Sequence, residues 1–313
     1  MSKRFIGARQ TTLAREVELI GTGVHSGKPV SVILHPAESG TGLRFLVSDN
    51  GGISADIAAN VRNVKALTLC TVLGDDTGVT VGTVEHLLAA LRGLAVDNCY
   101  VEIDSHEVPI MDGSAAPFVE AIDEVGIREL DEPRAFLKVL KPIRVQDGDC
   151  WGEIAPHSGF QLDVEIDFQS AIIGRQRLAL DLSPMVFRSE LCRARTFGFM
   201  HDVEKLWKAG LALGASLENT VAVGDERILN TEGLRYPQEF VRHKMLDAVG
   251  DLALAGYQIL GAYRSVRGGH RLNAHVVKAL LADTTAWTLI QSPPRMREAM
   301  AMRPYGMALA AGE

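Results

Sequence analysis

The sequence predicts an α+β fold of two structurally duplicated domains, each a mostly antiparallel sheet packed with helices, stacked around an interdomain site. Two observations predict it. A pattern of strands, helix, strand, polar loop and helix occurs twice along the 313 residues, and polar side chains suited to metal binding recur at comparable places in the two copies. We expect the domains to span residues 1–132 and 133–313, divided near Glu132-Pro133-Arg134.

The first copy begins with three predicted strands joined by turns, at residues 17–20, 30–36 and 42–47. In the second copy, strands are predicted at residues 136–145, 151–156 and 160–168. The spacing from turn glycine to proline is similar, from Gly27 to Pro36 in the first copy and from Gly148 to Pro156 in the second. This similarity supports a duplication with little sequence identity.

Each copy then continues in the same order. In the first copy, a helix at 83–94 is followed by a strand at 99–104, a loop at 110–115 and a helix at 116–125. In the second copy, the corresponding segments are 240–255, 257–263, 264–270 and 272–282. The helices at 83–94 and 240–255 are therefore counterparts, and we expect both to face the interface between the domains.

Composition limits the class of protein. The chain is 47% hydrophobic and 23% charged, which is enough for a core in each of two domains. The first residues printed include no apolar h-region, and the sequence has no apolar run of about 18 residues, so we expect a cytoplasmic protein without stable membrane insertion. The net charge of −7, without a long basic run, argues against nucleic acid as a partner. We expect a monomer.

The four cysteines, Cys70, Cys99, Cys150 and Cys192, are scattered and form no Cys-x-x-Cys pair. This spacing argues against a disulfide framework and against a thiolate zinc site. We expect free thiols, and any metal would then take His and carboxylate ligands.

The helix at 240–255 carries His243, Asp247 and Asp251 on one strip. Residues four apart differ by only about 40° around a helix, so His243 and Asp247 can converge on one metal ion. A separate apolar stripe indicates a helix that is half buried, with its polar side towards a cleft. The pair could equally be a surface ion pair.

A third ligand is available from the counterpart helix, which carries Glu85 and His86. If the two halves pack face to face, His86 joins His243 and Asp247 and leaves a fourth position open for water. Two His and one carboxylate suit catalytic zinc, and Fe(II) equally well. The Glu-His pair could also be no more than an acidic residue placed favourably for the helix dipole.

Five segments, taken together, carry a resemblance that spans nearly the whole chain. They are Thr83-Val-Glu-His-Leu-Leu-Ala-Ala-Leu, Ile110-Met-Asp-Gly-Ser-Ala-Ala-Pro-Phe118, Arg193-Ala-Arg-Thr-Phe-Gly-Phe199, Phe240-Val-Arg-His-Lys-Met-Leu-Asp-Ala-Val-Gly-Asp251 and Gly269-His270. They closely resemble the signature segments of the UDP-3-O-acyl-N-acetylglucosamine deacetylase family. Its members perform the committed, zinc-dependent step of lipid A synthesis in Gram-negative bacteria, and the family fold has two such domains.

The resemblance implies a role for each matching residue. It makes His86, His243 and Asp247 the zinc ligands and Glu85 the general base that takes a proton from the attacking water. It makes Thr196 a hydroxyl donor to the oxyanion, and Lys244 a residue near the substrate. Protonated His270 would stabilise the oxyanion or protonate the departing amine, and Asp251 would orient it and raise its pKa. No organic cofactor is implied.

The resemblance also implies a hydrophobic passage for the acyl chain of the UDP-3-O-acyl-N-acetylglucosamine substrate. It would be formed by residues 197–215, with a second insert at residues 64–71. We expect it to be lined by the following residues: Leu69, Phe197, Phe199, Val203, Trp207 and Leu213. The segment from 201 to 213 has helical spacing, which Gly210 weakens, so the helix could bend or end there. It could instead be an amphipathic helix that only packs on the core.

Two other features of the sequence can be explained without a role in catalysis. Ser114 can cap the helix that follows it while Asp112 and Gly113 form the preceding turn, so this motif is interpreted as scaffold. Arg271 could be a surface charge or a contact for the UDP diphosphate. Two other classes, a metal-free UDP-sugar-binding protein and an RNA-binding protein, are opposed by Glu85 and by the acidic net charge, respectively.

Overall fold

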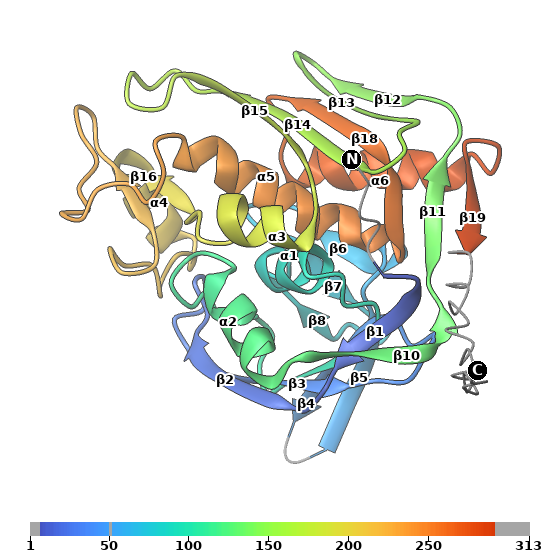
Figure 1. Ribbon diagram of the computed structural model, residues 1–313. Coiled ribbons are helices and arrows are strands. Elements are labelled where there is room, and N and C mark those ends of the chain that lie inside the picture. The colour runs from blue at the N-terminus through green and yellow to red at the C-terminus, as the bar shows by residue number, and fades with distance from the viewer. Residues whose placement is uncertain (1–6, 50–51, 292–313) are drawn as a thin grey trace, which may run out of the picture.

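The computed structural model describes residues 7–49 and 52–291. Two sheets form the outer layers, and the main helices lie between them (Figure 1). The first sheet, from the N-terminal half, lies at the bottom of that view, and the sheet from the second half lies at the top. The fold is α+β, as the sequence predicts.

The first sheet has the strand order β2-β3-β9-β4-β5. Strand β3 alternates buried Val30, Val32 and Leu34 with less buried residues, so one face of the sheet packs on the helices. The strands are β2 (Val17–Thr22), β3 (Pro29–Pro36), β4 (Leu43–Asp49), β5 (Gly52–Ala58) and β9 (Cys99–Ile103).

The second sheet is centred on one long strand, β18, which pairs with β13, β14 and β11. Two edge strands and a hairpin strand complete it, and β18 itself is buried along most of its length. Its strands are β11 (Ala135–Val139), β12 (Ile143–Asp147), β13 (Cys150–Ala155), β14 (Phe160–Asp167), β15 (Arg175–Asp181), β18 (Gln258–Val266) and β19 (Trp287–Gln291).

The two sheets share one strand order. The path β2-β3-β9-β4-β5 has antiparallel, antiparallel, parallel and antiparallel pairs in turn. The path β12-β13-β18-β14-β15 has the same sequence of pair directions. Each sheet is mostly antiparallel, and each has a strand from later in its half inserted between two earlier hairpins.

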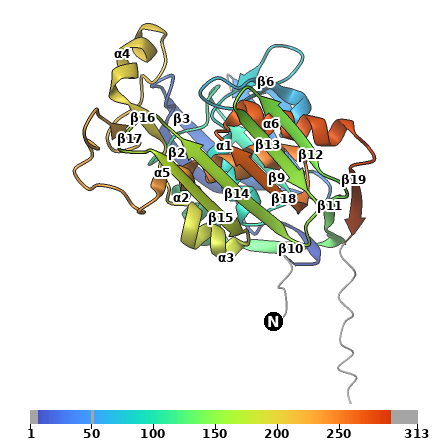
Figure 2. The same ribbon diagram turned by 90° about the horizontal axis from the view of Figure 1, so that it is seen from above.

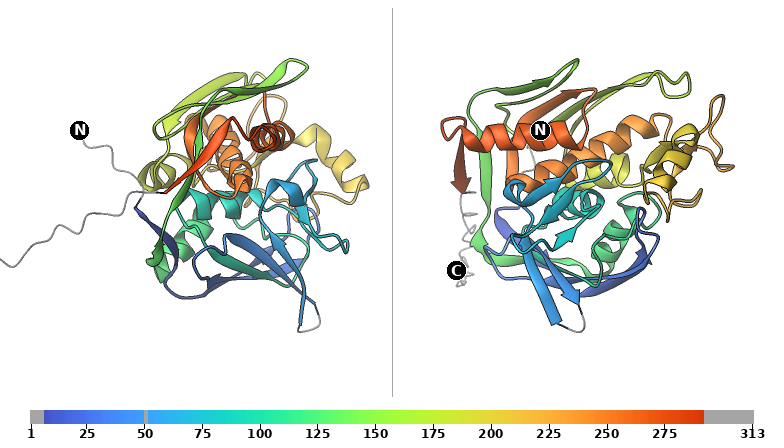
Figure 3. Two further views of the ribbon diagram at one scale, coloured as in Figure 1. Left: turned by 90° about the vertical axis from the view of Figure 1, so that its right-hand side faces the viewer. Right: turned by 180° about the vertical axis from the view of Figure 1, so that it is seen from behind.

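Shorter strands form three small sheets at the periphery. β1 (Arg9–Leu13) pairs with β10 (Ile127–Pro133), and the chain then passes from β10 into the second half (Figure 3). The other strands are β6 (Val64–Ala66), β7 (Val72–Gly74), β8 (Thr80–Val81), β16 (Phe197–Phe199) and β17 (Val221–Val223).

Two helices form the centre of the molecule, α1 (Glu85–Gly93) and α5 (Glu239–Leu252). They pack on each other between the sheets, and every residue of α1 is buried. The sequence predicts a half-buried α5 whose polar side faces a cleft. The helix is more buried than that, because its polar strip is also buried, at the contact with the first half.

The remaining helices surround this pair. α2 (Ala116–Val125) packs on α1 and β2, and α6 (His270–Ala282) packs on α5, β12 and β13. Short helical segments are η1 (Val61–Asn63), α3 (Pro184–Val186), the π-helical η2 (Phe187–Leu191) and η3 (Ala253–Ala255). α4 (Met200–Lys208) has no buried residue and stands out from the body of the molecule (Figure 2).

Two predicted segments differ from the structure. The strand predicted at 136–145 is broken into β11 and β12 around Pro142, which has no N–H to donate to a ladder. The loop predicted at 264–270 is wrong in its first half, because β18 continues to Val266. A charged residue is tolerated in this part of the strand because Arg264 is exposed, with its Nε 3.5 Å from an Asp163 carboxylate oxygen.

Within the described residues, no helix is both long enough and apolar enough to cross a membrane. All four cysteines are free thiols, as predicted.

Candidate metal centre

Three side chains from the two central helices meet at the centre of the molecule. Asp247 Oδ1 lies 3.5 Å from His86 Nε2 and 3.4 Å from His243 Nε2. All three residues are buried, and one potential ligand atom from each lies within 4.8 Å of the others. The two imidazole rings are perpendicular, with centroids 4.9 Å apart. The structure therefore brings together the three side chains that the sequence predicted as ligands.

The hydrogen bonds around this cluster leave two of its buried atoms without a partner among the described residues. They are Asp247 Oδ1, which lies between the imidazoles, and His86 Nδ1. His243 Nδ1 is 3.0 Å from the carbonyl oxygen of Ala194, to which it donates, so its Nε2 carries a lone pair that faces Asp247. An unpaired buried carboxylate oxygen costs about 1–3 kcal/mol or more. A divalent cation between the two imidazoles and Asp247 would remove that cost, so the residues present fit a metal ion.

The electrostatics of the cluster favour ligands in their metal-binding forms. Burial lowers the pKa of His243 to about 3, so its imidazole is neutral at physiological pH. Burial alone would raise the pKa of Asp247, but the positive charge of nearby Lys244 helps to hold it well below its usual range. The site therefore presents a carboxylate and a neutral imidazole without needing to lose protons first.

Lys244 lies at the edge of the cluster. Its Nζ donates a 2.8 Å hydrogen bond to Asp247 Oδ2, and it lies 5.5 Å from the centroid of the Phe197 ring. Burial alone would lower the pKa of Lys244, but the Asp247 carboxylate raises it above its usual range. Lys244 is therefore a permanent positive charge beside the candidate metal site.

A second polar group lies next to the ligands and contains Glu85, His270 and Asp251. His270 Nδ1 is 2.9 Å from Asp251 Oδ2, and its Nε2 is 3.7 Å from Glu85 Oε1. Burial alone would lower the pKa of His270, but Asp251 and Glu85 raise it to about 10. Burial raises the pKa of Glu85 above its usual range, against the effect of His270. The arrangement can therefore offer an imidazolium and a carboxyl group of elevated basicity side by side.

Two further residues hold this group together, and the sequence did not single them out. The backbone N–H of Thr71 donates to Glu85 Oε2 at 3.0 Å, and its hydroxyl donates to Asp251 Oδ1 at 2.6 Å. Asn273 Nδ2 donates to Asp251 Oδ2 at 2.8 Å. Neither residue has a distinctive sequence context, and both become identifiable only when the two halves are packed together.

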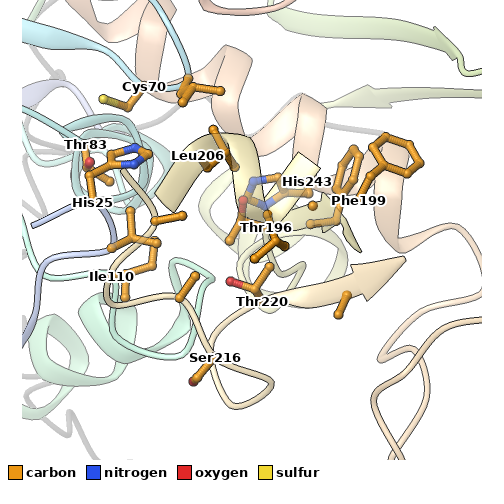
Figure 4. A pocket seen from close by; sticks show the side chains of 18 of the residues that line it. His25, Cys70, Thr83, Ile110, Thr196, Phe199, Leu206, Ser216, Thr220 and His243 are labelled. Carbon is orange, nitrogen blue, oxygen red and sulfur yellow. The ribbon is translucent and has the colours of Figure 1, made fainter. Parts of the chain in front are cut away.

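The cluster forms part of the lining of a cavity of about 340 Å³. Its walls come from both halves of the chain: His25 and Thr83 lie on one side, and Thr196, Phe199 and His243 on another (Figure 4). Another part of the lining comes from α4 and the loop after it and is mainly apolar. The apolar lining there includes Met200, Val203, Leu206, Trp207, Ala212, Ala215 and Leu217.

Most of the predicted site residues line this cavity. Besides the candidate ligands, Glu85, Lys244 and His270, they include Leu69, Thr196, Phe197, Phe199, Val203 and Trp207. The predicted Leu213 is not among the described lining residues. The helix ends at Lys208, and Gly210 and Ala212 have positive φ values of 71° and 56°, which turn the chain before Leu213. The N–H of Leu213 instead donates to the carbonyl oxygen of His25 at 3.2 Å.

His25 and Thr83 are cavity residues that the sequence reasoning missed. His25 follows Gly-Thr-Gly-Val, a pattern that predicts only a turn, and Thr83 stands at the start of a predicted helix. The available signal was a histidine inside a glycine-rich turn. His25 Nδ1 is buried and has no hydrogen-bond partner among the described residues.

The Asp112-Gly113-Ser114 motif is scaffold, as interpreted from the sequence, and it also positions Thr196. The N–H of Thr196 donates to the Gly113 carbonyl at 2.7 Å. Asp112 Oδ2 accepts a 2.7 Å hydrogen bond from Arg235 Nη1, and Ser114 Oγ accepts one from the N–H of Ala116, the first residue of α2. Arg271 forms an ion pair with Asp147 and is exposed, so the structure places it as a surface charge.

Comparison with known proteins adds an independent line of evidence. The protein-family model described as UDP-3-O-acyl N-acetylglycosamine deacetylase matches residues 10–282. Proteins named UDP-3-O-acyl-N-acetylglucosamine deacetylase from Brucella ovis and Brucella abortus are 52% identical over 288 residues, covering 92% of this chain and 100% of each relative. A protein of the same name from Brucella melitensis is 51% identical over the same coverage.

Proposed function

We propose a reaction and a mechanism for this chain, which belongs to the UDP-3-O-acyl-N-acetylglucosamine deacetylase family. It hydrolyses the N-acetyl group of a UDP-3-O-(3-hydroxyacyl)-N-acetylglucosamine and releases acetate and the free amine, the committed step of lipid A biosynthesis. The observation that carries this proposal is the buried cluster of His86, His243 and Asp247 in the wall of a cavity whose remaining lining is largely apolar.

The proposed cofactor is a divalent metal ion held by His86, His243 and Asp247, with Zn²⁺ as the first candidate and Fe²⁺ as the alternative. When bound, such an ion supplies Lewis-acid chemistry, which lowers the pKa of water and polarises a carbonyl group. The unpartnered Asp247 Oδ1 and the neutral His243 imidazole support this ligand set.

Glu85 is the proposed general base. Its Oε2 is fixed by the Thr71 N–H, and its Oε1 is directed towards His270 Nε2, on the cavity side of the network. Its raised pKa makes it a better proton acceptor than an exposed glutamate. It takes the proton from water as the water oxygen attacks the acetamide carbonyl carbon.

His270 and Thr196 complete the proposed machinery. His270 is held by Asp251 and is protonated at neutral pH, so its Nε2–H can stabilise the oxyanion or protonate the departing amine. Thr196 lines the same cavity and can donate its hydroxyl to the oxyanion. Lys244 supplies a fixed positive charge beside the reacting groups.

The apolar part of the cavity lining is the proposed contact surface for the 3-O-acyl chain. Leu69, Phe197, Phe199, Val203 and Trp207 would contact it, whereas Leu213 contacts the first half of the chain instead. These apolar side chains would favour an alkyl chain over water by about 25 cal/mol per Å² of buried apolar surface. α4, which contributes to this lining, has no buried residue.

We further propose that residues 1–132 and 133–313 are the two domains and that they arose by duplication. The shared strand order of the two sheets supports this division, and the proposed boundary falls where β10 ends. The cytoplasmic location and the monomeric state remain predictions.

The proposed function is tested by removing and restoring the metal. Dialysis against a chelator should abolish deacetylation of UDP-3-O-acyl-N-acetylglucosamine, and stoichiometric Zn²⁺ or Fe²⁺ should restore it. Turnover that continues unchanged after complete metal removal, verified by elemental analysis, would refute the metal-dependent mechanism.

A further inference from the structure

The contact between α1 and α5 includes a close approach of main chain to main chain at Gly250. This glycine lies inside α5, between Asp247 and Asp251. A Cβ atom placed on it would lie 2.0 Å from the carbonyl oxygen of Glu85, 2.8 Å from its carbonyl carbon and 3.0 Å from its Cα. All three atoms belong to the backbone of α1, so no side-chain rotation can relieve the overlap.

The position of this glycine is costly for the helix itself. A glycine inside a helix is less favourable than alanine by about 1 kcal/mol. Nothing in the local conformation of α5 needs it, because Gly250 is not among the residues with positive φ. The helix contact accounts for it: only the absence of a Cβ lets α1 come this close.

The approach occurs at the residue that carries the proposed general base and immediately precedes a proposed ligand. Glu85 begins α1, and His86 follows it. The partner residues His243, Asp247 and Asp251 are on α5. The separation of the two helix backbones at Gly250 therefore fixes how far His86 and Glu85 are from the groups that they face.

We propose that Gly250 is a positioning residue that sets the separation of α1 and α5, so that His86 can bind the same metal ion as His243 and Asp247. This inference rests on the proposed metal site. A Cβ 2.0 Å from the Glu85 carbonyl oxygen would have to move to an ordinary contact of about 3.5 Å, so the two helix backbones would separate by more than about 1 Å. The packed interior offers little free space to absorb this shift in another way. Metal-ligand distances tolerate only about 0.2 Å.

The chain offers two matched control positions. Gly93 lies at the other end of α1, and a Cβ there would lie 2.5 to 2.7 Å from ring carbons of Phe187, so Gly93→Ala overpacks the core without touching the α5 backbone. A Cβ at Gly159 would meet only His157, at 3.8 Å, which is an ordinary contact. Gly93→Ala therefore controls for lost stability, and Gly159→Ala controls for the substitution itself.

The experiment measures metal affinity of the purified protein for Zn²⁺ by competition with a chromophoric chelator, alongside unfolding by denaturant. We expect Gly250→Ala to bind Zn²⁺ about 10- to 100-fold more weakly than the unaltered protein, in the range observed when groups that orient metal ligands are removed. The visible spectrum of the Co²⁺ form should change as well. Gly93→Ala should lose stability but retain its affinity and spectrum, and Gly159→Ala should retain all three properties.

Affinity and a Co²⁺ spectrum in Gly250→Ala that match those of the unaltered protein would overturn the inference while leaving the proposed function standing. An unaltered protein that binds no metal would overturn the proposed function and this inference with it. If Gly250→Ala is unfolded in the absence of metal, the experiment measures instead how much Zn²⁺ stabilises the folded state of each variant. Recovery of full stability with Zn²⁺ would then overturn the inference, whereas Zn²⁺ that stabilises Gly93→Ala but not Gly250→Ala would support it.

Discussion

The hydroxyl of Thr71 donates a 2.6 Å hydrogen bond to Asp251 Oδ1, which joins the first half of the chain to the second beneath the candidate site. The N–H of the same residue donates to Glu85 Oε2. Thr71 is fully buried and thus connects the carboxylate proposed as general base with the carboxylate that holds His270.

This link predicts a specific effect of Thr71→Val. Valine has nearly the same shape, and its N–H still reaches Glu85, but Asp251 loses one hydrogen bond. Hydrogen bonds to charged groups contribute about 1.5–3 kcal/mol, so kcat should fall about 10- to 100-fold. Steady-state kinetics should show this in kcat with little change in KM.

Thr71→Ser is the matched control, because it keeps the hydroxyl and should retain most of the activity. If valine and serine at this position reduce kcat equally, the hydroxyl is not what positions Asp251.

Glu85→Ala should separate proton transfer from metal binding. Glu85 lies beside His86 but is not one of the three clustered ligands, so the variant should keep its metal. Its turnover should fall about 10²- to 10⁴-fold, the usual contribution of a general base. Elemental analysis and single-turnover assays on the same sample check both parts. Metal lost together with activity would mean that Glu85 is a ligand.

The dependence of kcat/KM on pH should show an acidic limb set by Glu85 and an alkaline limb set by His270. Activity needs ionised Glu85, whose pKa is raised, so kcat/KM should fall on acidification at a higher pH than an exposed glutamate would give. Activity also needs protonated His270, whose pKa is raised to about 10, so kcat/KM should fall again as the pH rises through that value.

His270→Gln tests the alkaline limb, because the variant should have low activity at every pH and lose the decline near pH 10. An unchanged decline in this variant would assign the alkaline limb to another group.

The stability of the second half should depend on a buried ion pair. Arg195 Nε donates a 2.9 Å hydrogen bond to Glu239 Oε1, and both side chains are almost fully buried. Glu239→Ala leaves the guanidinium without this partner and should cost about 3–5 kcal/mol of unfolding free energy.

Glu204→Ala is the control for that measurement. Glu204 forms a 4.0 Å ion pair with Lys208 on the surface of α4, and its loss should cost less than about 0.5 kcal/mol. Equal losses in the two variants, measured by denaturant unfolding, would contradict the assignment.

The sequence was sufficient for those parts of the fold that depend on local pattern. Alternation predicted β3, β13 and β14, and residues 116–125 were predicted as the helix that the structure shows as α2. The spacing of His243 and Asp247 predicted a pair of ligands on one helix, and the repeated order of elements supplied His86 from the other helix.

The parts that the sequence missed depend on contacts between distant segments. Thr71 and Asn273 acquire their importance only when the halves are packed together, and the closeness of Gly250 to Glu85 has no local signature. Helical spacing extended to Leu213, and Gly210 marked a place where the helix could bend or end; α4 ends at Lys208, and the backbone turns at Gly210 and Ala212 put Leu213 beyond it.

The most direct test of the account is a crystal structure of the protein purified with its metal, with diffraction data collected on both sides of the zinc absorption edge. The account predicts one anomalous peak, within bonding distance of Asp247 and of one nitrogen each from His86 and His243. A catalytically active crystal form in which this position holds no metal, or in which the metal lies elsewhere, would contradict it.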